Sequence, residues 1–132
     1  MKNNDINTED RILDSAFNIF LLFGYHGTTL QQIAMQTGVN KSAIHYYFRS
    51  KERLYTKVVK KVLDLYFDTK VEINTTRKEL EKLTWFLVSE LYNNKTLFEE
   101  TLKEIYPDDW DGRLHNLANW LQFTDVRYYK IL

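Results

Sequence analysis

Apolar residues recur along most of the chain with the three- and four-residue spacing of amphipathic helices. The first stripe predicts a helix over about residues 8–23, which Gly24 is placed to end. Its members are Ile12, Ala16, Ile19, Phe20 and Phe23. Only four glycines and one proline interrupt the chain, and such long gaps between helix breakers favour an all-α fold over a turn-rich sheet.

Two short helices separated by a tight turn are predicted between residues 28 and 48. Thr29 and Gln32 fit a capping box at the start of the first helix, and Gly38 permits the positive φ at which that helix stops. Asn40 is a suitable N-cap for the second helix. The inward-facing residues of the second helix should be Ile44 and Phe48. Two helices joined in this way form a helix-turn-helix, which places its second helix in the major groove of DNA.

A long helix is predicted to follow, with Ser50 as its N-cap and an end near Thr69. Its apolar side carries Leu54, Val58, Val62 and Leu65. A helix of this length can connect a DNA-reading head to a separate body. We therefore expect a three-helix headpiece at residues 1–55 and a helical body at residues 56–132.

Three further helices are predicted in the body, which should begin near Thr75. The first is interrupted at Asn93 and Asn94, the second ends before the proline, and Asp108 or Asp109 could cap the third. The apolar positions of these helices are Leu80, Leu83, Leu87 and Leu91, then Leu97, Leu102 and Ile105, then Leu114, Leu117, Ala118 and Leu121. Residues 125–132 form too short a stretch to assign.

The net charge of zero conceals an uneven distribution. Residues 1–60 hold eight Lys and Arg against five Asp and Glu, whereas residues 61–132 hold ten against thirteen. From Lys41 to Lys61, seven basic residues are opposed by one acid, Glu52, which gives a net charge of +6. Because neutralising DNA phosphates releases counterions, such a patch would supply affinity that does not depend on sequence. For the lysines at 57, 60 and 61, a solvated helix face is the alternative interpretation.

Composition also narrows the functional classes. The absence of cysteine excludes disulfides and cysteine-ligated zinc and fits a reducing cytoplasm. There is no run of about 18 apolar residues and no signal-peptide pattern, so a cytoplasmic protein without a membrane segment is expected. His26, His45 and His115 lie too far apart for a His-x₃-His metal site, and neither a glycine-rich phosphate loop nor a nucleophile elbow is present. We expect no enzyme, no metal and no cofactor.

Ordered motifs between residues 8 and 55 resemble the DNA-binding domain of the tetracycline-repressor (TetR) family. They read RILDSA at 11–16, FGY at 23–25, GTT at 27–29, IA at 33–34, GVNKS at 38–42, YYF at 46–48 and SKERL at 50–54. Ser42 and His45 depart from the family's more frequent glycine and tyrosine, which affects the choice of bases read. The resemblance implies a bacterial transcriptional regulator, a ligand-responsive repressor that acts as a homodimer on a near-palindromic operator in double-stranded DNA. The body is shorter than usual for the family, so the chain is a naturally short member or an incomplete stretch of a longer one.

The same resemblance implies which residues contact DNA. Backbone contacts would come from helix starts, where free N–H groups favour a phosphate, and from two tyrosines. These residues are Thr28, Lys41, Tyr46, Tyr47 and Lys51. For base reading, Ser42 can donate or accept, Ala43 can touch a thymine methyl, and His45 can bond to guanine N7 or O6. The alternatives are that the tyrosines pack against the first or fourth helix and that His45 has no base partner.

By analogy with the family, the body would hold an unknown small-molecule inducer. Aromatic side chains with a few polar anchors suit an apolar pocket, although each could instead belong to an ordinary core. The candidates are Trp85, Phe86, Trp110, His115, Asn119, Trp120 and Phe123. Binding would tilt the long helix and lower operator affinity. The competing function is a helical protein-interaction module that kept the headpiece without operator binding, and the basic patch argues against it.

Overall fold

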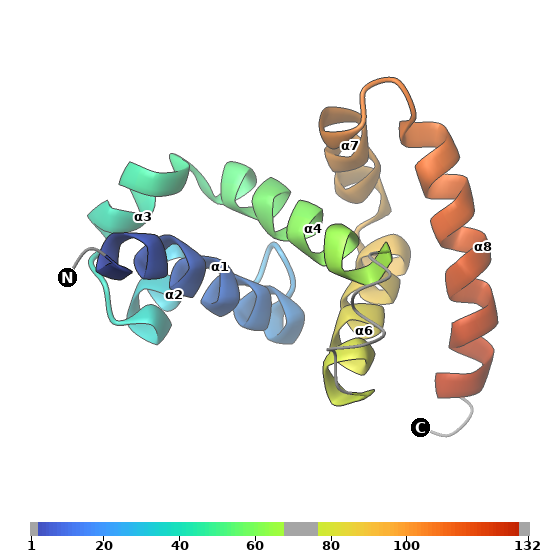
Figure 1. The fold of residues 1–132 in the computed structure, drawn as a ribbon, viewed down its shortest axis with the longest axis horizontal. Coiled ribbons are helices and arrows are strands. Elements are labelled where there is room, and N and C mark those ends of the chain that lie inside the picture. Colours follow the sequence, from blue (N-terminus) through green and yellow to red (C-terminus); the bar gives the residue numbers. More distant parts are fainter. Residues whose placement is uncertain (1–2, 68–76, 130–132) are drawn as a thin grey trace. The chain divides into compact units, whose positions relative to one another are not determined.

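The computed structural model describes residues 3–67 and 77–129, with side chains described within residues 8–67 and 78–119. All regular secondary structure in the described residues is helical, as the apolar spacing predicted (Figure 1). The chain divides into two compact units, residues 1–61 and residues 62–132. The division falls six residues after the boundary expected from the sequence, because the buried stripe of the fourth helix continues to pack in the first unit.

The first unit contains a helix-turn-helix supported by two longer helices (Figure 1). Helix α1 (Asn3–Phe23) packs against α2 (Leu30–Thr37), and α2 packs against α3 (Lys41–Phe48). Helix α4 (Lys51–Phe67) begins in this unit and its last residues belong to the second. The predicted end of this helix, Thr69, lies outside the described residues.

Apolar side chains from all four helices form the core of the first unit. The buried residues are Ile12, Ala16, Ile19 and Phe20 of α1, Ile33 and Ala34 of α2, Ile44 and Phe48 of α3, and Leu54, Tyr55, Val58 and Val59 of α4. Phe23, expected in the α1 stripe, is 54% exposed. The chain turns at Gly24 (φ 74°), and Tyr25 closes this end of the core instead. The Tyr25 ring stacks on Phe20 with 6.0 Å between centroids and meets Tyr55 edge-on at 5.1 Å.

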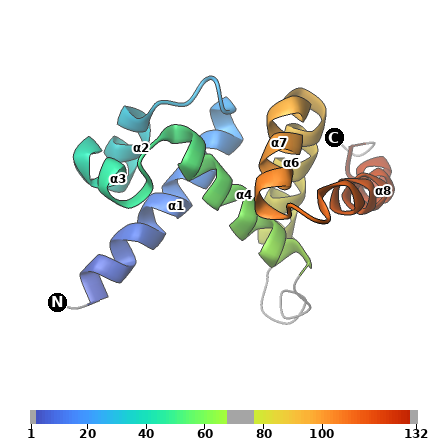
Figure 2. The same cartoon turned by 90° about the horizontal axis from the view of Figure 1, so that it is seen from above.

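The second unit contains α6 (Arg77–Asn93), α7 (Lys95–Ile105) and α8 (Trp110–Tyr129), each of which packs against the other two (Figure 2). These helices confirm the three predicted from the apolar spacing, and α8 continues through residues 125–129, which the pattern left unassigned. Its described core consists of Val62, Leu63, Leu83, Phe86, Leu87, Val88, Leu91, Phe98, Leu102 and Leu117. The predicted start of the body, Thr75, lies outside the described residues.

Candidate nucleic-acid interface

The start of α2 is fixed by the predicted capping box. The Thr29 hydroxyl accepts a hydrogen bond from the Gln32 N–H at 3.1 Å, and the Gln32 Oε1 accepts one from the Thr29 N–H at 2.7 Å. Two of the otherwise unpaired groups at the helix start are thereby satisfied. The pair fixes the direction in which the chain enters the helix-turn-helix.

The turn between α2 and α3 depends on Gly38 and Arg11. Gly38 adopts φ 80° and ψ 33°, a left-handed conformation that residues with a Cβ disfavour. Its N–H and that of Val39 both donate to the Ala34 carbonyl, at 2.8 and 3.0 Å, which closes a Schellman-type helix end. The Arg11 guanidinium of α1 donates to the Thr37 carbonyl at 2.5 Å. This hydrogen bond joins the end of α2 to α1.

Helix α3 presents polar side chains on one face and buries its apolar ones on the other. Ile44 and Phe48 are 0% and 3% exposed, which confirms that they face inward. The predicted base-reading and backbone-contacting residues of α3 divide by exposure: Lys41, Ser42, His45 and Tyr46 are exposed, and Ala43 and Tyr47 are half-buried. Within the first unit, the polar face of α3 is therefore exposed and accessible to a ligand.

Asn40 stands at the N-cap position of α3 in an extended conformation (φ −75°, ψ 150°), as predicted, but its side chain makes no capping hydrogen bond. The Asn40 carbonyl accepts from the Ala43 N–H at 3.0 Å, so the first turn of α3 is tight. An acceptor such as a phosphate oxygen could bind where the Asn40 side chain does not.

The two tyrosines of α3 differ in exposure. Tyr46 is 76% exposed, whereas Tyr47 is half-buried and borders the core residue Phe48, with 6.3 Å between ring centroids. The two tyrosine rings meet edge-on at 5.0 Å, an arrangement that restrains both. Tyr46 is thus displayed on the outer surface, and Tyr47 supports it from the side.

Thr28 does not occupy the surface position that the resemblance implied. Its side chain is 1% exposed, and its hydroxyl donates to the Gly24 carbonyl at 2.6 Å. Its backbone N–H donates to the Tyr25 carbonyl at 3.2 Å. The expected phosphate contact by the Thr28 side chain is therefore corrected: Thr28 holds the α1–α2 loop, and the exposed residue at this helix start is Thr29.

Lys51 is engaged within the first unit. Its ammonium donates to the carbonyls of Tyr25 at 2.9 Å and of Thr28 at 3.0 Å, and it lies 4.1 Å from the centroid of the Tyr25 ring. Burial lowers the pKa of the Lys51 ammonium, and burial together with the charge of Glu52 raises the pKa of the Tyr25 hydroxyl. An ammonium has three N–H donors, so at most one remains for a phosphate. These contacts of Lys51 hold the α1–α2 loop against the start of α4, and we call them the Lys51 clamp.

The α3–α4 turn contains a strained residue that the sequence motifs did not reveal. Arg49 has φ 77° and ψ −46°, and the Ser50 N–H donates to the Phe48 carbonyl at 2.9 Å, which is the pattern of a γ-turn. The His45 Nδ1 lies 3.1 Å from the Arg49 carbonyl oxygen. Ser50 caps α4 as predicted, since its hydroxyl accepts from the Arg53 N–H at 3.1 Å. No glycine or asparagine at position 49 signals this turn.

Only some side chains of the predicted basic patch are exposed where DNA could contact them. Lys41, Arg49, Arg53 and Lys57 are exposed. Lys61, in contrast, pairs with Asp14 of α1 at 3.2 Å between charged atoms. The exposed cations that lie nearest α3 in sequence are therefore Lys41, Arg49 and Arg53.

The predicted inducer residues whose side chains the structure describes differ in their surroundings. Phe86 is buried in the core, Trp85 is 43% exposed, and the Lys103 ammonium lies 4.6 Å from the Trp110 ring centroid. The exposed His115 and Asn119 are hydrogen-bonded to each other at 3.2 Å. The side chains of Trp120 and Phe123 lie outside the described residues.

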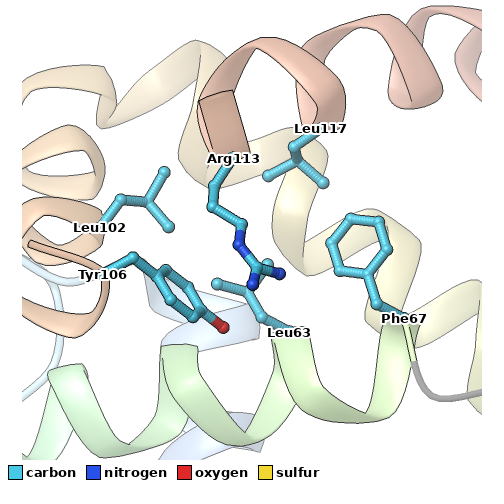
Figure 3. A pocket seen from close by; sticks show the side chains of 6 residues that line it. All are labelled: Leu63, Phe67, Leu102, Tyr106, Arg113 and Leu117. Atoms are coloured by element: carbon cyan, nitrogen blue, oxygen red, sulfur yellow. The ribbon is translucent and has the colours of Figure 1, made fainter. Parts of the chain in front are cut away.

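A small cavity within the second unit has a different lining. It is formed by Leu63, Phe67, Leu102, Tyr106, Arg113 and Leu117 (Figure 3). The Arg113 guanidinium reaches into this space from α8 and lies 4.4 Å from the Tyr106 ring centroid. The cavity measures about 10 Å³, which is close to the space that one water molecule requires. Among the predicted inducer residues with described side chains, none lines this cavity.

Other kinds of site can be assessed in the part of the chain that the structure describes. Within it, no three His, Cys, Asp or Glu side chains are grouped so that they could hold a metal ion. None of the described helices combines the length and apolar content that a membrane span requires.

Residues 12–58 match the family described as bacterial regulatory proteins, tetR family. The HTH-type transcriptional regulator RutR of Escherichia coli is 49% identical over 55 residues, which cover 42% of this chain and 26% of RutR. The biofilm operon icaADBC HTH-type negative transcriptional regulator IcaR of Staphylococcus aureus is 28% identical over 115 residues, which cover 81% of this chain and 59% of IcaR. The chain thus spans about a quarter of RutR and less than two thirds of IcaR.

Solved structures of similar fold include two mutants of HlyIIR. One, with a GSSGSSG linker, is 24% identical with a TM-score of 0.59, and the match covers 95% of this chain and 88% of that one. The other, with a linker containing two thrombin sites, is 22% identical with a TM-score of 0.57 over 92% and 87% of the two chains. At these identities the likeness establishes the fold.

Proposed function

Because the chain belongs to the tetR family of bacterial regulatory proteins through its first unit, we propose that it binds double-stranded DNA in a sequence-specific manner and represses transcription. The observation that carries the proposal is the division of α3 into two faces. Ile44 and Phe48 anchor the helix in the core, while Lys41, Ser42 and His45 point their polar groups outward. A helix anchored on one side and polar on the other suits a major groove.

The proposed contacts divide into two classes. Lys41, Tyr46 and the exposed start of α2 at Thr29 would hold phosphates, with Tyr47 behind Tyr46 and with the remaining N–H of Lys51 as a further donor. Ser42, Ala43 and His45 would contact base edges. Arg49 and Arg53, both exposed, would add charge that attracts DNA of any sequence.

A homodimer on a near-palindromic site is part of the proposal. One helix-turn-helix seldom supplies enough affinity by itself, and two heads related by a two-fold axis read two half-sites about one helical turn apart. The mass of the chain with and without short palindromic DNA tests this directly. A one-to-one complex at all concentrations would contradict a dimeric repressor.

We also propose that the chain responds to a small-molecule inducer, which at the described cavity would require the second unit to open. The described cavity of about 10 Å³ is far below the roughly 300–1,000 Å³ of ordinary ligand pockets. An inducer that entered at this cavity would have to separate helices that are packed around it, and coupling to DNA release requires it to bind the two states unequally. Titration of aromatic compounds into a preformed DNA complex, followed by fluorescence anisotropy, would detect release of the DNA.

The salt dependence of DNA binding tests the main proposal. A labelled duplex from immediately upstream of the gene that encodes the chain is titrated with protein at several salt concentrations. Lys41→Ala should weaken binding to specific and unrelated duplexes alike and reduce the slope of log affinity against log salt by about 0.9, the value for one lost phosphate contact. Lys82→Ala, an exposed lysine of α6, is the matched control and should leave the slope unchanged.

Two results would overturn the proposal. If the chain bound no duplex at any salt concentration, the headpiece would serve another purpose, and the interaction module would be the better account. If Lys41→Ala and Lys82→Ala had equal slopes, α3 would not face the phosphates.

A further inference from the structure

The imidazole of His45 is hydrogen-bonded to the turn that follows α3. Its Nδ1 lies 3.1 Å from the carbonyl oxygen of Arg49. A carbonyl oxygen can only accept a hydrogen bond, so Nδ1 must carry the proton. In the neutral ring the other nitrogen, Nε2, then has a free lone pair and no hydrogen. The neutral ring of His45 therefore presents an acceptor at its far edge.

The position of that carbonyl is itself fixed. The γ-turn at Arg49, closed by the 2.9 Å bond from the Ser50 N–H to the Phe48 carbonyl, sets the direction of the peptide. The Arg49 N–H also donates to the His45 carbonyl at 3.0 Å, so residues 45 and 49 are joined through both backbone and side chain. Such a strained residue persists where its surroundings over-determine it, often at a functional site.

The side chain is placed where a base could meet it. His45 is exposed, while its neighbour Ile44 is completely buried and anchors the helix beneath it. The ring cannot rotate freely about its Cβ bond without losing the bond to Arg49. The outward edge of the ring consequently has a defined direction and a defined hydrogen-bonding character.

Base edges in the major groove differ in what they offer an acceptor. Cytosine presents its N4 amino group and adenine its N6 amino group, whereas guanine presents only the acceptors N7 and O6, and thymine presents O4 and a methyl group. We propose that neutral His45 acts as a hydrogen-bond acceptor that selects an amino-bearing base, cytosine or adenine, at one position of each half-site. This differs from the guanine contact expected from the side chain alone, and it rests on the proposed function.

The experiment is a selection from a library of randomised duplexes by the 132-residue chain at pH 7.5, followed by sequencing. The wild-type chain should enrich cytosine or adenine over guanine at one position by roughly fivefold, the ratio expected for one neutral hydrogen bond. His45→Ala should lose the preference at that position alone. His45→Arg, which replaces an acceptor by a donor, should enrich guanine there.

A matched control keeps the outcome interpretable. Lys41→Ala should lower the yield of bound DNA but keep the base preference at the position that responds to His45. Circular dichroism of each variant checks that it folds, and since Lys41 and His45 are both exposed, all three variants should melt close to the wild-type chain. In addition, the ¹⁵N spectrum of the imidazole rings should show the Nδ1–H form for His45, with the exposed His26 as an internal reference.

The possible failures separate the two proposals. If the wild-type chain enriched guanine or thymine at the position sensitive to His45, the acceptor role would be wrong while DNA binding stood. The same conclusion would follow if His45→Ala altered no position, or if the spectrum showed the Nε2–H form. If no duplex were enriched at all, the proposed function would fail, and the acceptor role with it.

Discussion

Replacing Lys51 by methionine separates a structural role from a DNA-binding one. Methionine keeps an unbranched apolar stem but has no charge and no N–H groups. The substitution removes the hydrogen bonds to the Tyr25 and Thr28 carbonyls, at 2.9 and 3.0 Å, and the ammonium contact with the Tyr25 ring at 4.1 Å. The α1–α2 loop would lose the clamp that ties it to the start of α4.

The expected loss of stability can be worked out from these contacts. A net hydrogen bond contributes about 1 kcal/mol, and a cation–π contact at a partly exposed site about 0.5–1 kcal/mol. Solvent reaches this half-buried side chain, so the values at the lower end apply. Two hydrogen bonds and one cation–π contact at about 0.5 kcal/mol sum to about 2.5 kcal/mol, which is a large part of the stability of a domain this small.

A urea titration followed by far-UV circular dichroism measures this loss, and hydrogen exchange of the α1 and α2 amides localises it. Lys57→Met, at an exposed lysine of the same helix, is the control and should unfold close to the wild-type midpoint. Should Lys51→Met unfold at the same urea concentration as Lys57→Met while binding DNA more weakly, the clamp would be unimportant and Lys51 would act mainly on phosphate.

Two other substitutions test the turns on either side of α3. Gly38→Ala should destabilise the chain by about 1 kcal/mol in urea unfolding, because a Cβ is disfavoured at φ 80°. The nearest atom, Arg11 Nη2, would lie 3.9 Å from that Cβ, so backbone strain and not a clash is the cause, and an unchanged urea midpoint would contradict this reasoning. Arg49→Gly should raise the free energy of unfolding by about 1 kcal/mol, because glycine adopts φ 77° without strain, and the loss of the Arg49 charge should weaken binding to all duplexes. A lower urea midpoint would mean that the Arg49 side chain stabilises the turn by more than the backbone strain at this residue costs.

Much of the first unit could be predicted because local chemistry and core packing agree there. The capping box at Thr29 and Gln32 and the left-handed Gly38 are set by residues within a few positions of each other. The inward placement of Ile44 and Phe48 follows from the helical period. These features need no knowledge of distant contacts, so their sequence signals were sufficient.

The contacts that the sequence did not reveal lie where a side chain has a choice of partners. Thr28 and Lys51 stand at helix starts, where a phosphate contact is reasonable, but the Thr28 hydroxyl and two N–H groups of Lys51 bond to carbonyls in or next to the α1–α2 loop. Sequence spacing does not reveal that a lysine 26 residues away lies beside the Tyr25 carbonyl. A second adjacent threonine was the available signal, since only one of the pair can cap the helix.

The second unit was predictable as helices but not as a binding site. Its apolar stripes gave the three helices, whereas aromatic residues such as Trp85 and Phe86 are neighbours on α6 with opposite exposures. Composition alone could not assign them to a common pocket. The cavity lining includes Arg113 and Tyr106, a pair brought together by the turn between α7 and α8.

The most direct test of the central claim is a chemical footprint of α3. Because the chain has no cysteine, Ser42→Cys and, as a control, Asn93→Cys each introduce a single thiol at an exposed position. Alkylation of each thiol is timed with and without a saturating duplex taken from the selection. The account predicts that DNA slows alkylation at position 42 and leaves position 93 unchanged. Equal rates at position 42 with and without bound DNA would contradict it.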